Sequence, residues 1–177
     1  MKHQPYEIRN AVPGEFEAVG QLMVQVYSQL DGFPKPTEQP AYYRTLANVG
    51  DFTSKPETEL LVAVSQDQKI CGALVYFGDM QYYGSGGIAT RENNAAGFRL
   101  LAVDSAHRGA GIAKLLVEAC IQRARESHRG QLVIHTTKSM LTAWKMYENM
   151  GFRRSEDLDF LQGGLSVFGF RLLLSNP

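Results

Sequence analysis

The sequence predicts a mixed α/β fold in which helices pack on a central, mixed and partly antiparallel sheet. Strand-like apolar runs and segments of helical periodicity follow one another in the order β-α-α-β-β-β-α-β-α-β-β. The chain has 177 residues, of which 44% are hydrophobic and 20% charged, as is ordinary for a globular protein. This length suffices for one sizeable core, so we expect residues 1–177 to form a single domain.

The N-terminal part of the chain predicts one strand followed by two helices. Apolar and polar side chains alternate over residues 5–10, which is typical of a strand. Pro13 suits the first turn of a helix, and a helical apolar stripe runs from Phe16 to Leu30. The segment DGFPKP at residues 31–36 ends this helix, and residues 39–49 predict a second, shorter one.

Two more strands and a long connection follow. The apolar runs at residues 60–64 and 70–77 are joined by the polar segment QDQK, which predicts a hairpin. The next connection, residues 78–97, contains three glycines between positions 84 and 87. A loop of that length in a compact domain is usually functional or mobile.

The second half of the chain predicts the remaining strands and helices. A strand at residues 98–103 leads into a helix that begins near Ile112, and Gly130 is the expected C-cap of that helix. A strand follows at residues 132–136, and Ser139 is the expected N-cap of a helix that ends near Met150. Two further segments predict closing strands: residues 152–161 and 167–174.

Charge and hydropathy exclude several classes of partner. The chain has 18 basic and 18 acidic residues, so its formal net charge is zero and we expect neither nucleic acid nor an anionic membrane as partner. No apolar run approaches the roughly eighteen residues of a transmembrane span. The N-terminal segment MKHQPYEIRN lacks the apolar core of a signal peptide, so we expect a cytoplasmic protein.

Cysteine and histidine positions favour neither a disulfide nor a metal site. Cys71 lies in an apolar strand pattern and Cys120 on the apolar stripe of a helix, so we expect both to be buried free thiols. The histidines lack the spacing of metal ligands: His3, His107, His128 and His135. We therefore expect no bound metal.

The segment from Leu100 to Leu116 predicts a phosphate-binding site. It contains a strand, a loop with the sequence Arg-Gly-Ala-Gly, and the start of a helix. The N-terminus of a helix offers backbone N–H groups without intrahelical partners and carries partial positive charge. Glycine allows a phosphate to approach the backbone closely, and Arg108 adds a fixed positive charge. These features together indicate a phosphorylated cofactor.

Two common nucleotide-binding motifs are excluded. A P-loop requires G-x-x-x-x-G-K-[ST], and the chain contains no such string. In a dinucleotide fingerprint a third small residue belongs where this chain has Lys114, and the next strand, residues 131–137, offers no carboxylate for a ribose.

The residues that fit are Arg108-x-x-Gly111-x-Ala113, which resemble the pyrophosphate loop Gln/Arg-x-x-Gly-x-Gly/Ala of the GCN5-related N-acetyltransferases, the GNAT family. A second match lies downstream. The segment Ala143-Trp-Lys-Met-Tyr147-Glu-Asn-Met-Gly-Phe is similar to the family's Ala-x-x-x-Tyr-x-x-x-Gly-Phe. The resemblance covers roughly residues 58–174 and implies the acyl-CoA N-acyltransferase fold across the chain.

The resemblance implies acetyl-CoA as co-substrate, with direct attack of a primary amine on its thioester in a ternary complex. It also implies that loop amides bind the pyrophosphate and that the preceding strand binds the pantetheine arm. The residues expected to bind this cofactor are Leu101, Ala102, Val103, Arg108, Gly109, Ala110, Gly111, Ile112, Ala113 and Lys114.

Tyr147 occupies the general-acid position of the family, and a phenol of ordinary pKa near 10 can donate a proton to a thiolate. The alternative is that Tyr147 belongs to the core, since it lies on a helical apolar stripe. Many relatives carry an asparagine seven residues before this tyrosine, where the present chain has Met140. Ser139 and Thr137 are candidates to replace that contact.

The base and the acceptor are less constrained. Glu92, Asp79 and Asp104 are candidates to take a proton from the amine, and no spacing selects among them. By family analogy, four residues of the two long loops line the acceptor pocket: Asp31, Phe33, Tyr82 and Tyr83.

Two functions therefore stay open. One is an N-acetyltransferase acting on a small-molecule or peptide amine, which the presence of Tyr147 favours. The other is a non-catalytic acyl-CoA-binding sensor or regulatory domain. For the apolar run from Phe168 to Leu174, a homodimer interface and burial in the core are both open interpretations.

Overall fold

The computed structural model describes residues 5–174, so His3 lies outside the described residues. The chain forms two compact units. The first contains residues 5–55, 59–75 and 100–119, and the second contains residues 56–58, 76–99 and 120–174. The expectation of a single domain stays a prediction.

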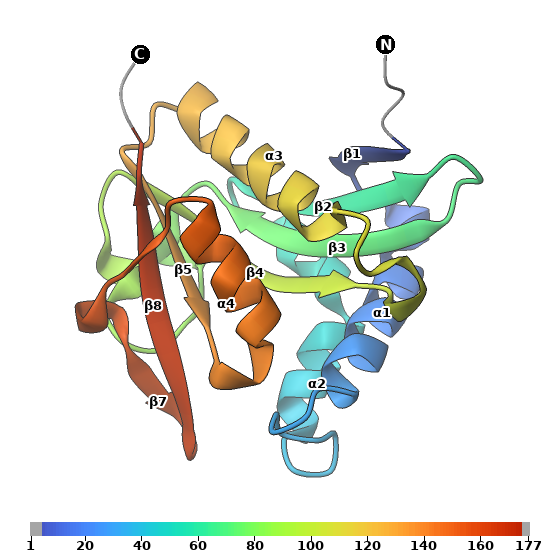
Figure 1. Ribbon diagram of the computed structural model, residues 1–177, viewed down its shortest axis with the longest axis horizontal. Helices are drawn as coiled ribbons and strands as arrows, with labels where there is room; N and C mark the ends of the chain where they lie inside the picture. The colour runs from blue at the N-terminus through green and yellow to red at the C-terminus, as the bar shows by residue number, and fades with distance from the viewer. Residues whose placement is uncertain (1–4, 175–177) are drawn as a thin grey trace. The chain divides into compact units, whose positions relative to one another are not determined.

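Up to α4 the elements follow one another in the predicted order, with α-helices connecting strands of a mixed sheet, and three strands rather than the two predicted follow α4 (Figure 1). Their bounds are β1 (Tyr6–Asn10), α1 (Phe16–Ser28), α2 (Pro40–Ala47), β2 (Thr58–Ser65), β3 (Ile70–Phe77), β4 (Ala95–Val103), α3 (Ile112–Glu126), β5 (Gln131–Thr136), α4 (Leu141–Asn149), β6 (Arg153–Arg154), β7 (Phe160–Gln162) and β8 (Leu165–Leu173). The predicted mixed α/β fold is confirmed.

The first unit contains β1, β2, most of β3, the second half of β4, both N-terminal helices and the start of α3. β1 pairs antiparallel with β2, and β2, β3 and β4 follow as neighbours. The start of α3 packs on β3 at Gly72, where an added Cβ would lie 2.8 Å from Ile112 Cγ2. Helices α1 and α2 approach so closely at Gly20 that a Cβ there would collide with the Ala47 carbonyl. Glycine at these two positions therefore sets the distance between the packed elements.

The second unit contains the first half of β4, the strands β5 to β8, and α4. β4 runs parallel to β5, in a register that extends from Ala95 opposite Gln131 to Gly97 opposite Val133. β5 pairs antiparallel with β8 over its whole length, and both β6 and β7 pair with β8. The combination of parallel and antiparallel pairs makes this sheet mixed, as predicted.

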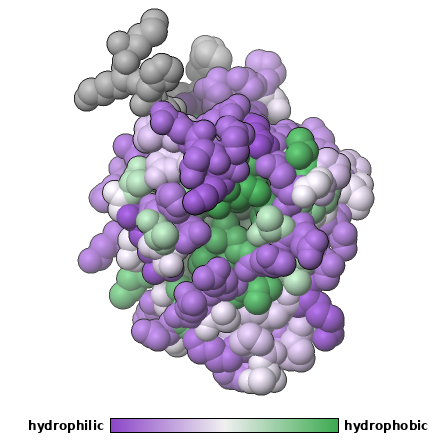
Figure 2. All heavy atoms as spheres, turned by 90° about the vertical axis from the view of Figure 1, so that its right-hand side faces the viewer, coloured by the Kyte–Doolittle hydropathy of each residue, from purple (hydrophilic) through white to green (hydrophobic). Residues whose placement is uncertain are grey.

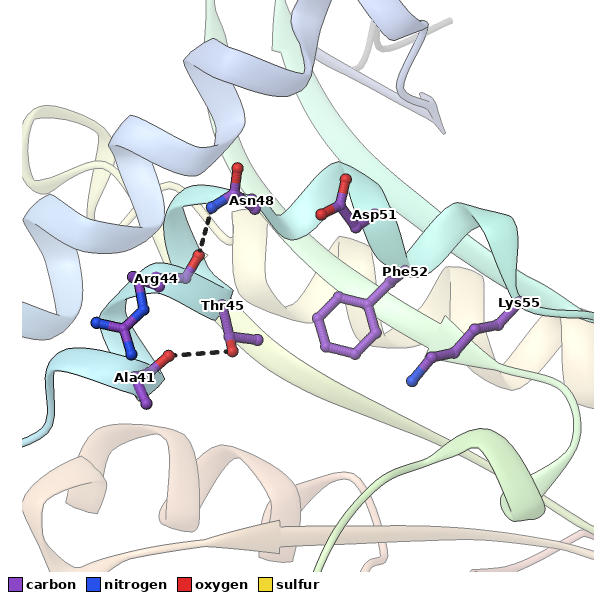
Figure 3. A pocket seen from close by; sticks show the side chains of 7 residues that line it. All are labelled: Ala41, Arg44, Thr45, Asn48, Asp51, Phe52 and Lys55. Carbon is purple, nitrogen blue, oxygen red and sulfur yellow. Dashed lines mark hydrogen bonds between the residues drawn. The ribbon is translucent and has the colours of Figure 1, made fainter.

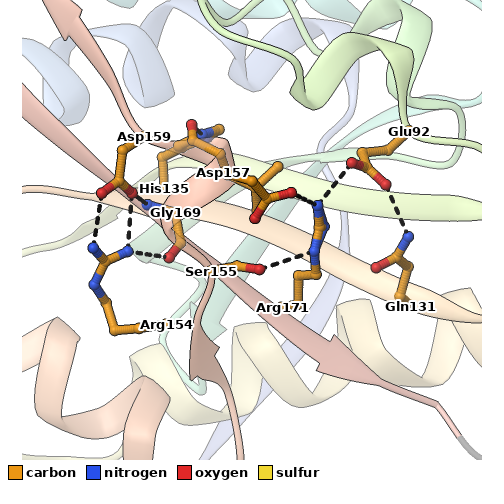
Figure 4. A network of polar contacts seen from close by, with 10 residues as sticks. Glu92, Gln131, His135, Arg154, Ser155, Asp157, Asp159, Gly169 and Arg171 are labelled. Atoms are coloured by element: carbon orange, nitrogen blue, oxygen red, sulfur yellow. Dashed lines mark hydrogen bonds and ion pairs between the residues drawn. The ribbon is translucent and has the colours of Figure 1, made fainter.

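Arg154 ties this last group of strands together (Figure 4). Its guanidinium donates to both carboxylate oxygens of Asp159, at 2.9 and 2.8 Å, and to the Gly169 carbonyl at 2.7 Å. Asp159 also accepts from the Gly169 N–H at 2.7 Å. The hydrogen bonds from Arg154 hold the pKa of Asp159 below its ordinary value, so the carboxylate is charged at neutral pH.

These contacts explain why the predicted strand at residues 152–161 is wrong in part. The chain forms β6, then a 3-10 helix, Glu156–Leu158, and then β7. Leu158 is fully buried in that turn, and Asp159 follows it to bind Arg154. Residues 152–161 read FRRSEDLDFL, a mostly polar segment whose weak alternation does not reveal such a break.

Three other predicted boundaries also need correction. β4 begins at Ala95 rather than at residue 98, because small buried residues that favour no strand pattern open it. α3 ends at Glu126, so Gly130 is not its C-cap, and His128 rather than Gly130 adopts the left-handed conformation (φ 57°) typical of a helix C-terminus. α4 begins after Met140 with no side-chain cap, so Ser139 does not cap it.

Burial agrees with the predicted core. As expected, Cys71 and Cys120 are both buried and are not joined in a disulfide. In the C-terminal apolar run, Phe170 is fully buried and Leu173 is 77% exposed, so the run contributes to the core in part, and the homodimer stays a prediction. Among residues 5–174, no helix is both long and apolar enough to cross a bilayer. Hydrophilic side chains cover most of the face in Figure 2, with smaller hydrophobic areas among them.

Candidate functional site

The candidate phosphate loop is anchored to its own unit before it turns outward. After β4, the Asp104 N–H donates to the Cys71 carbonyl of β3 at 2.9 Å. The Asp104 carboxylate accepts from the Ala106 N–H at 2.9 Å and so caps the short 3-10 helix Ser105–His107. The His107 ring also lies beside Tyr6, whose hydroxyl is 3.2 Å from His107 Nδ1. The chain therefore reaches Arg108 from a fixed position.

Gly109 and Gly111 adopt the left-handed conformation, with φ of +79° and +80°. L-residues with a side chain reach this region only at a cost of about 1–2 kcal/mol. A Cβ added at either glycine would meet nothing within 4 Å. Glycine is therefore required by the backbone conformation rather than by crowding, and the space in front of the loop is open.

The loop leads directly into the N-terminus of α3. The Leu115 N–H donates to the Gly111 carbonyl at 3.1 Å, which is the first bond of the helix. The amides from Gly111 to Lys114 precede that bond and are the donors that a helix leaves for an anion. Arg108 and the loop residues to Gly111 are exposed, whereas Ile112 is 2% exposed and anchors the helix. The donors and the open space fit a pyrophosphate.

Lys114 contributes less charge to the loop than the sequence suggests. Its ammonium lies 3.8 Å from the Glu118 carboxylate, one helical turn further on, and both side chains are at least half exposed. Such a pair keeps the ammonium on the outer face of α3. Of the predicted cofactor residues, Lys114 and Ile112 thus offer their amides rather than their side chains.

The strand before the loop presents its backbone groups to alternate edges. Because the Asp104 N–H points to β3, the N–H and C=O of Ala102 point to β3 as well. The corresponding groups of Leu101 and Val103 then point to the opposite edge. Of the three predicted strand residues, Leu101 and Val103 therefore carry the groups suited to bind an extended ligand.

A backbone irregularity precedes these residues. Leu100 lies within β4 with φ of +61°, a conformation that is a true outlier for a residue with a branched side chain. Its cost, about 1–2 kcal/mol, persists only where the surroundings enforce it, and such residues cluster at functional sites. The sequence offers no signal for it, since leucine does not favour this region.

Tyr27 of α1 is a further residue of this strand edge, and it was not predicted from the sequence. This residue is 4% exposed, and its hydroxyl donates to the Leu101 carbonyl at 3.0 Å. Its ring centroid lies 5.5 Å from that of Phe33 and 6.3 Å from that of Tyr42. Tyr27 lies on the helical stripe that predicts α1, where a role in the core is the ordinary interpretation. The pattern could therefore not distinguish a core residue from one that also binds the strand.

Tyr147 lies in α4 of the second unit and is 4% exposed. Its ring centroid is 5.9 Å from that of Phe98 and 5.7 Å from that of Phe152. Burial raises the pKa of Tyr147, so the phenol keeps its proton at neutral pH. In the described part of the chain, the buried Thr137 hydroxyl has no hydrogen-bond partner, which leaves it available to a ligand or a water.

The three candidate bases already have structural partners. Asp104 caps the helix before the loop, and Asp79 accepts from the Gln81 N–H at 3.0 Å, which lowers the pKa of Asp79. Glu92 accepts from Arg171 at 2.7 Å and from Gln131 at 3.2 Å (Figure 4). The structure therefore gives Asp104 and Asp79 backbone partners and Glu92 side-chain partners, and it singles out none of the three as a base.

The expected acceptor residues fall into separate groups. In the first unit, Asp31 is exposed while Phe33 is 8% exposed and packs on Tyr27. In the second unit, Tyr82 is partly exposed and Tyr83 is buried.

Tyr83 belongs to a buried chain of hydrogen bonds that was not predicted from the sequence. His135 Nε2 lies 2.9 Å from the Leu158 carbonyl, which only accepts, so Nε2 carries the proton and Nδ1 accepts from the Tyr83 hydroxyl at 3.0 Å. Burial lowers the pKa of His135, and Arg99 adds to this effect. The imidazole is therefore neutral and links β5 to the turn before β7.

A separate hollow of about 350 Å³ lies along α2 and the 3-10 helix Val49–Ser54 (Figure 3). It includes the side chains of Arg44 and Asp51, and the Lys55 ammonium lies 5.0 Å from the Phe52 ring centroid. No residue assigned to cofactor binding lines it. Within residues 5–174, no cluster of three or more potential metal ligands is present.

Comparison with known proteins places this chain in a family. Residues 23–152, nearly three quarters of the chain, match the model of the Acetyltransferase (GNAT) family. The chain belongs to the GNAT family of acetyltransferases, which confirms the family suggested by the two motifs.

The individual relatives either match a short segment of this chain or share its fold at low sequence identity. N-acetyltransferase 8B of Homo sapiens is 40% identical over 55 residues, which span 31% of this chain and 24% of that protein. A GNAT-family acetyltransferase from Staphylococcus aureus Mu50 shares the fold with a TM-score of 0.74 and 18% identity, over 96% of this chain and 99% of the other. The yncA protein of Salmonella typhimurium, solved with its cofactor acetyl-CoA, has a TM-score of 0.64 and 16% identity, over 98% and 96% of the two chains.

Proposed function

We propose that this protein is an acetyl-CoA-dependent N-acetyltransferase that acetylates a primary amine. The observation that carries the proposal is the loop between β4 and α3, in which two left-handed glycines face open space, with Arg108 directly before them in the chain and the N-terminus of α3 directly after them. This arrangement supplies donors and positive charge for a pyrophosphate with no side chain in the way. The family supports acetyl-CoA as the ligand.

The strand edge at Leu101 and Val103 is suited to the pantetheine arm, which is a chain of amides. An extended ligand with alternating donors and acceptors binds such an edge in the way that a neighbouring strand would. A backbone N–H at this edge is also a candidate to stabilise the negative charge that develops on the thioester oxygen when the amine attacks. Acetyl-CoA brings the activated acetyl group, and the chain binds and orients it.

Tyr147 is the proposed general acid that protonates the leaving thiolate. Its match to the family segment and its protonated state at neutral pH support this role. The base for the incoming ammonium is left unassigned, since Glu92, Asp79 and Asp104 all have structural partners. A water chain is a sufficient acceptor for that proton.

The first test is calorimetric titration of the native chain with acetyl-CoA, beside a folded Arg108→Glu/Gly111→Trp double variant. We expect micromolar binding by the native chain and none by the variant. Absence of binding by the native chain would refute the proposal. A positive result leads to a thiol-release screen with an amino acid, a polyamine and a peptide with a free N-terminus, and binding without turnover of any amine would favour a sensor instead.

A further inference from the structure

We propose that Tyr27 is a positioning residue for the acetyl donor, an inference that rests on the proposed function. Its hydroxyl holds the Leu101 carbonyl at 3.0 Å, on the edge of β4 that points away from β3. One of the two acceptor positions of that carbonyl is thereby used before any ligand arrives. The N–H and C=O of Val103 are then the complete pair that this edge offers to the arm of the donor.

The bond lies beside the backbone irregularity of β4. Leu101 directly follows Leu100, whose φ of +61° departs from the extended conformation of its neighbours. A residue in that conformation redirects the chain on either side of it, so a small rotation at Leu100 moves the peptide group between Leu101 and Ala102. The Tyr27 hydroxyl binds the oxygen of that same peptide group and so fixes its orientation.

Tyr27 is itself held rigidly enough to do this. It is 4% exposed, and its ring lies against those of Phe33 and Tyr42. A phenol on a packed ring has little freedom to turn, so its hydroxyl acts as a fixed point for the strand edge. The hydrogen bond spans from residue 27 to residue 101, and it therefore couples α1 to the donor-binding strand.

Tyr43 provides a matched control for this position. Like Tyr27 it is buried, at 5% exposure, and its hydroxyl donates to a backbone carbonyl, that of Pro34 at 2.7 Å. That carbonyl lies in the loop between α1 and α2 rather than on β4. Tyr43→Phe and Tyr27→Phe thus remove equivalent hydrogen bonds, and only the second removes one from the proposed site.

The experiment compares two probes: acetyl-CoA, and adenosine 3′-phosphate 5′-diphosphate, which retains the phosphates and lacks the arm. We expect Tyr27→Phe to weaken acetyl-CoA binding about three- to tenfold, the range for loss of one hydrogen bond, and to leave the armless probe within about twofold. Tyr43→Phe should bind both probes as the native chain does. Unchanged or tighter binding of acetyl-CoA by Tyr27→Phe, while the native chain binds it normally, would overturn this inference alone.

Hydrogen exchange gives a second readout that a general loss of stability does not reproduce. Acetyl-CoA should protect the Val103 amide in the native chain and in Tyr43→Phe, and protect it less in Tyr27→Phe at the same fractional saturation. Equal protection in all three chains would contradict the positioning role. If the native chain binds neither acetyl-CoA nor the armless probe, the proposed function itself is refuted.

Discussion

Replacement of Gly111 by alanine separates the conformational role of the loop from its role in binding. At φ of +80°, the added Cβ meets nothing within 4 Å, so the folded state is destabilised only by the left-handed backbone. That cost is about 1–2 kcal/mol. Alanine also lowers the entropy of the unfolded chain, which stabilises the folded state by about 0.4–1 kcal/mol and offsets part of the cost. We expect a net loss of about 1 kcal/mol in the free energy of unfolding, and a Tm about 2–4 °C lower.

The effect on binding should be larger, because the Cβ projects into the space proposed for the pyrophosphate. We expect acetyl-CoA affinity to fall at least about tenfold, measured by calorimetry on samples whose folding is verified by urea titration. Gly164→Ala is the control, since its Cβ also meets nothing within 4 Å and its φ is not left-handed. Acetyl-CoA affinity of Gly111→Ala within twofold of the native value would refute the loop as the pyrophosphate site, and an unchanged free energy of unfolding would refute the conformational argument.

Three further predictions concern single side chains. The hydrogen bond from Arg9 lowers the pKa of Glu15 to about 2, so Glu15→Gln should lower the free energy of unfolding by about 1 kcal/mol at pH 7. Urea titrations should show this difference between the two chains disappear as the pH falls from 4.5 towards 2. Burial lowers the pKa of His135, so the native chain should lose stability as the pH falls below 6.5, by at most about 1.4 kcal/mol per pH unit, and a flatter profile is expected for His135→Gln; identical profiles would contradict the buried neutral imidazole. Tyr147→Phe should reduce kcat about a hundredfold with acetyl-CoA affinity unchanged, and native turnover would exclude the phenol as proton donor.

Much of the fold was predictable because the long helices and strands show a clear hydrophobic periodicity in the sequence. The hairpin between β2 and β3, the stripe of α3 and the turn at Gly151 all follow from local pattern and turn chemistry. The break between β6 and β7 was not predictable, since it depends on the contact of Arg154 with Asp159 and Gly169. Asp159 is only five residues from Arg154, but Gly169 is 15 residues from Arg154 and lies in β8, outside any short sequence window.

The candidate site also has one part that was predictable from the sequence and one part that was not. Glycine spacing indicates the loop, because left-handed backbone has a residue preference that can be read from the sequence. The conformation of Leu100 and the bond from Tyr27 to Leu101 leave no such trace. The first contradicts the ordinary preference of leucine, and the second joins positions 74 residues apart. Both arise from tertiary packing rather than from local propensity.

The edge of β4 at Leu101 and Val103 has a consequence for how much of this protein a cell would maintain. If the arm of acetyl-CoA completes the hydrogen bonds of that edge, the ligand binds the folded chain and not the unfolded one. At a concentration of one hundred times its dissociation constant, such a ligand adds about 2.7 kcal/mol to the free energy of unfolding. A change of that size alters the fraction exposed to proteases by roughly a hundredfold. The abundance of the protein would then follow the supply of acetyl-CoA, independently of any change in its synthesis.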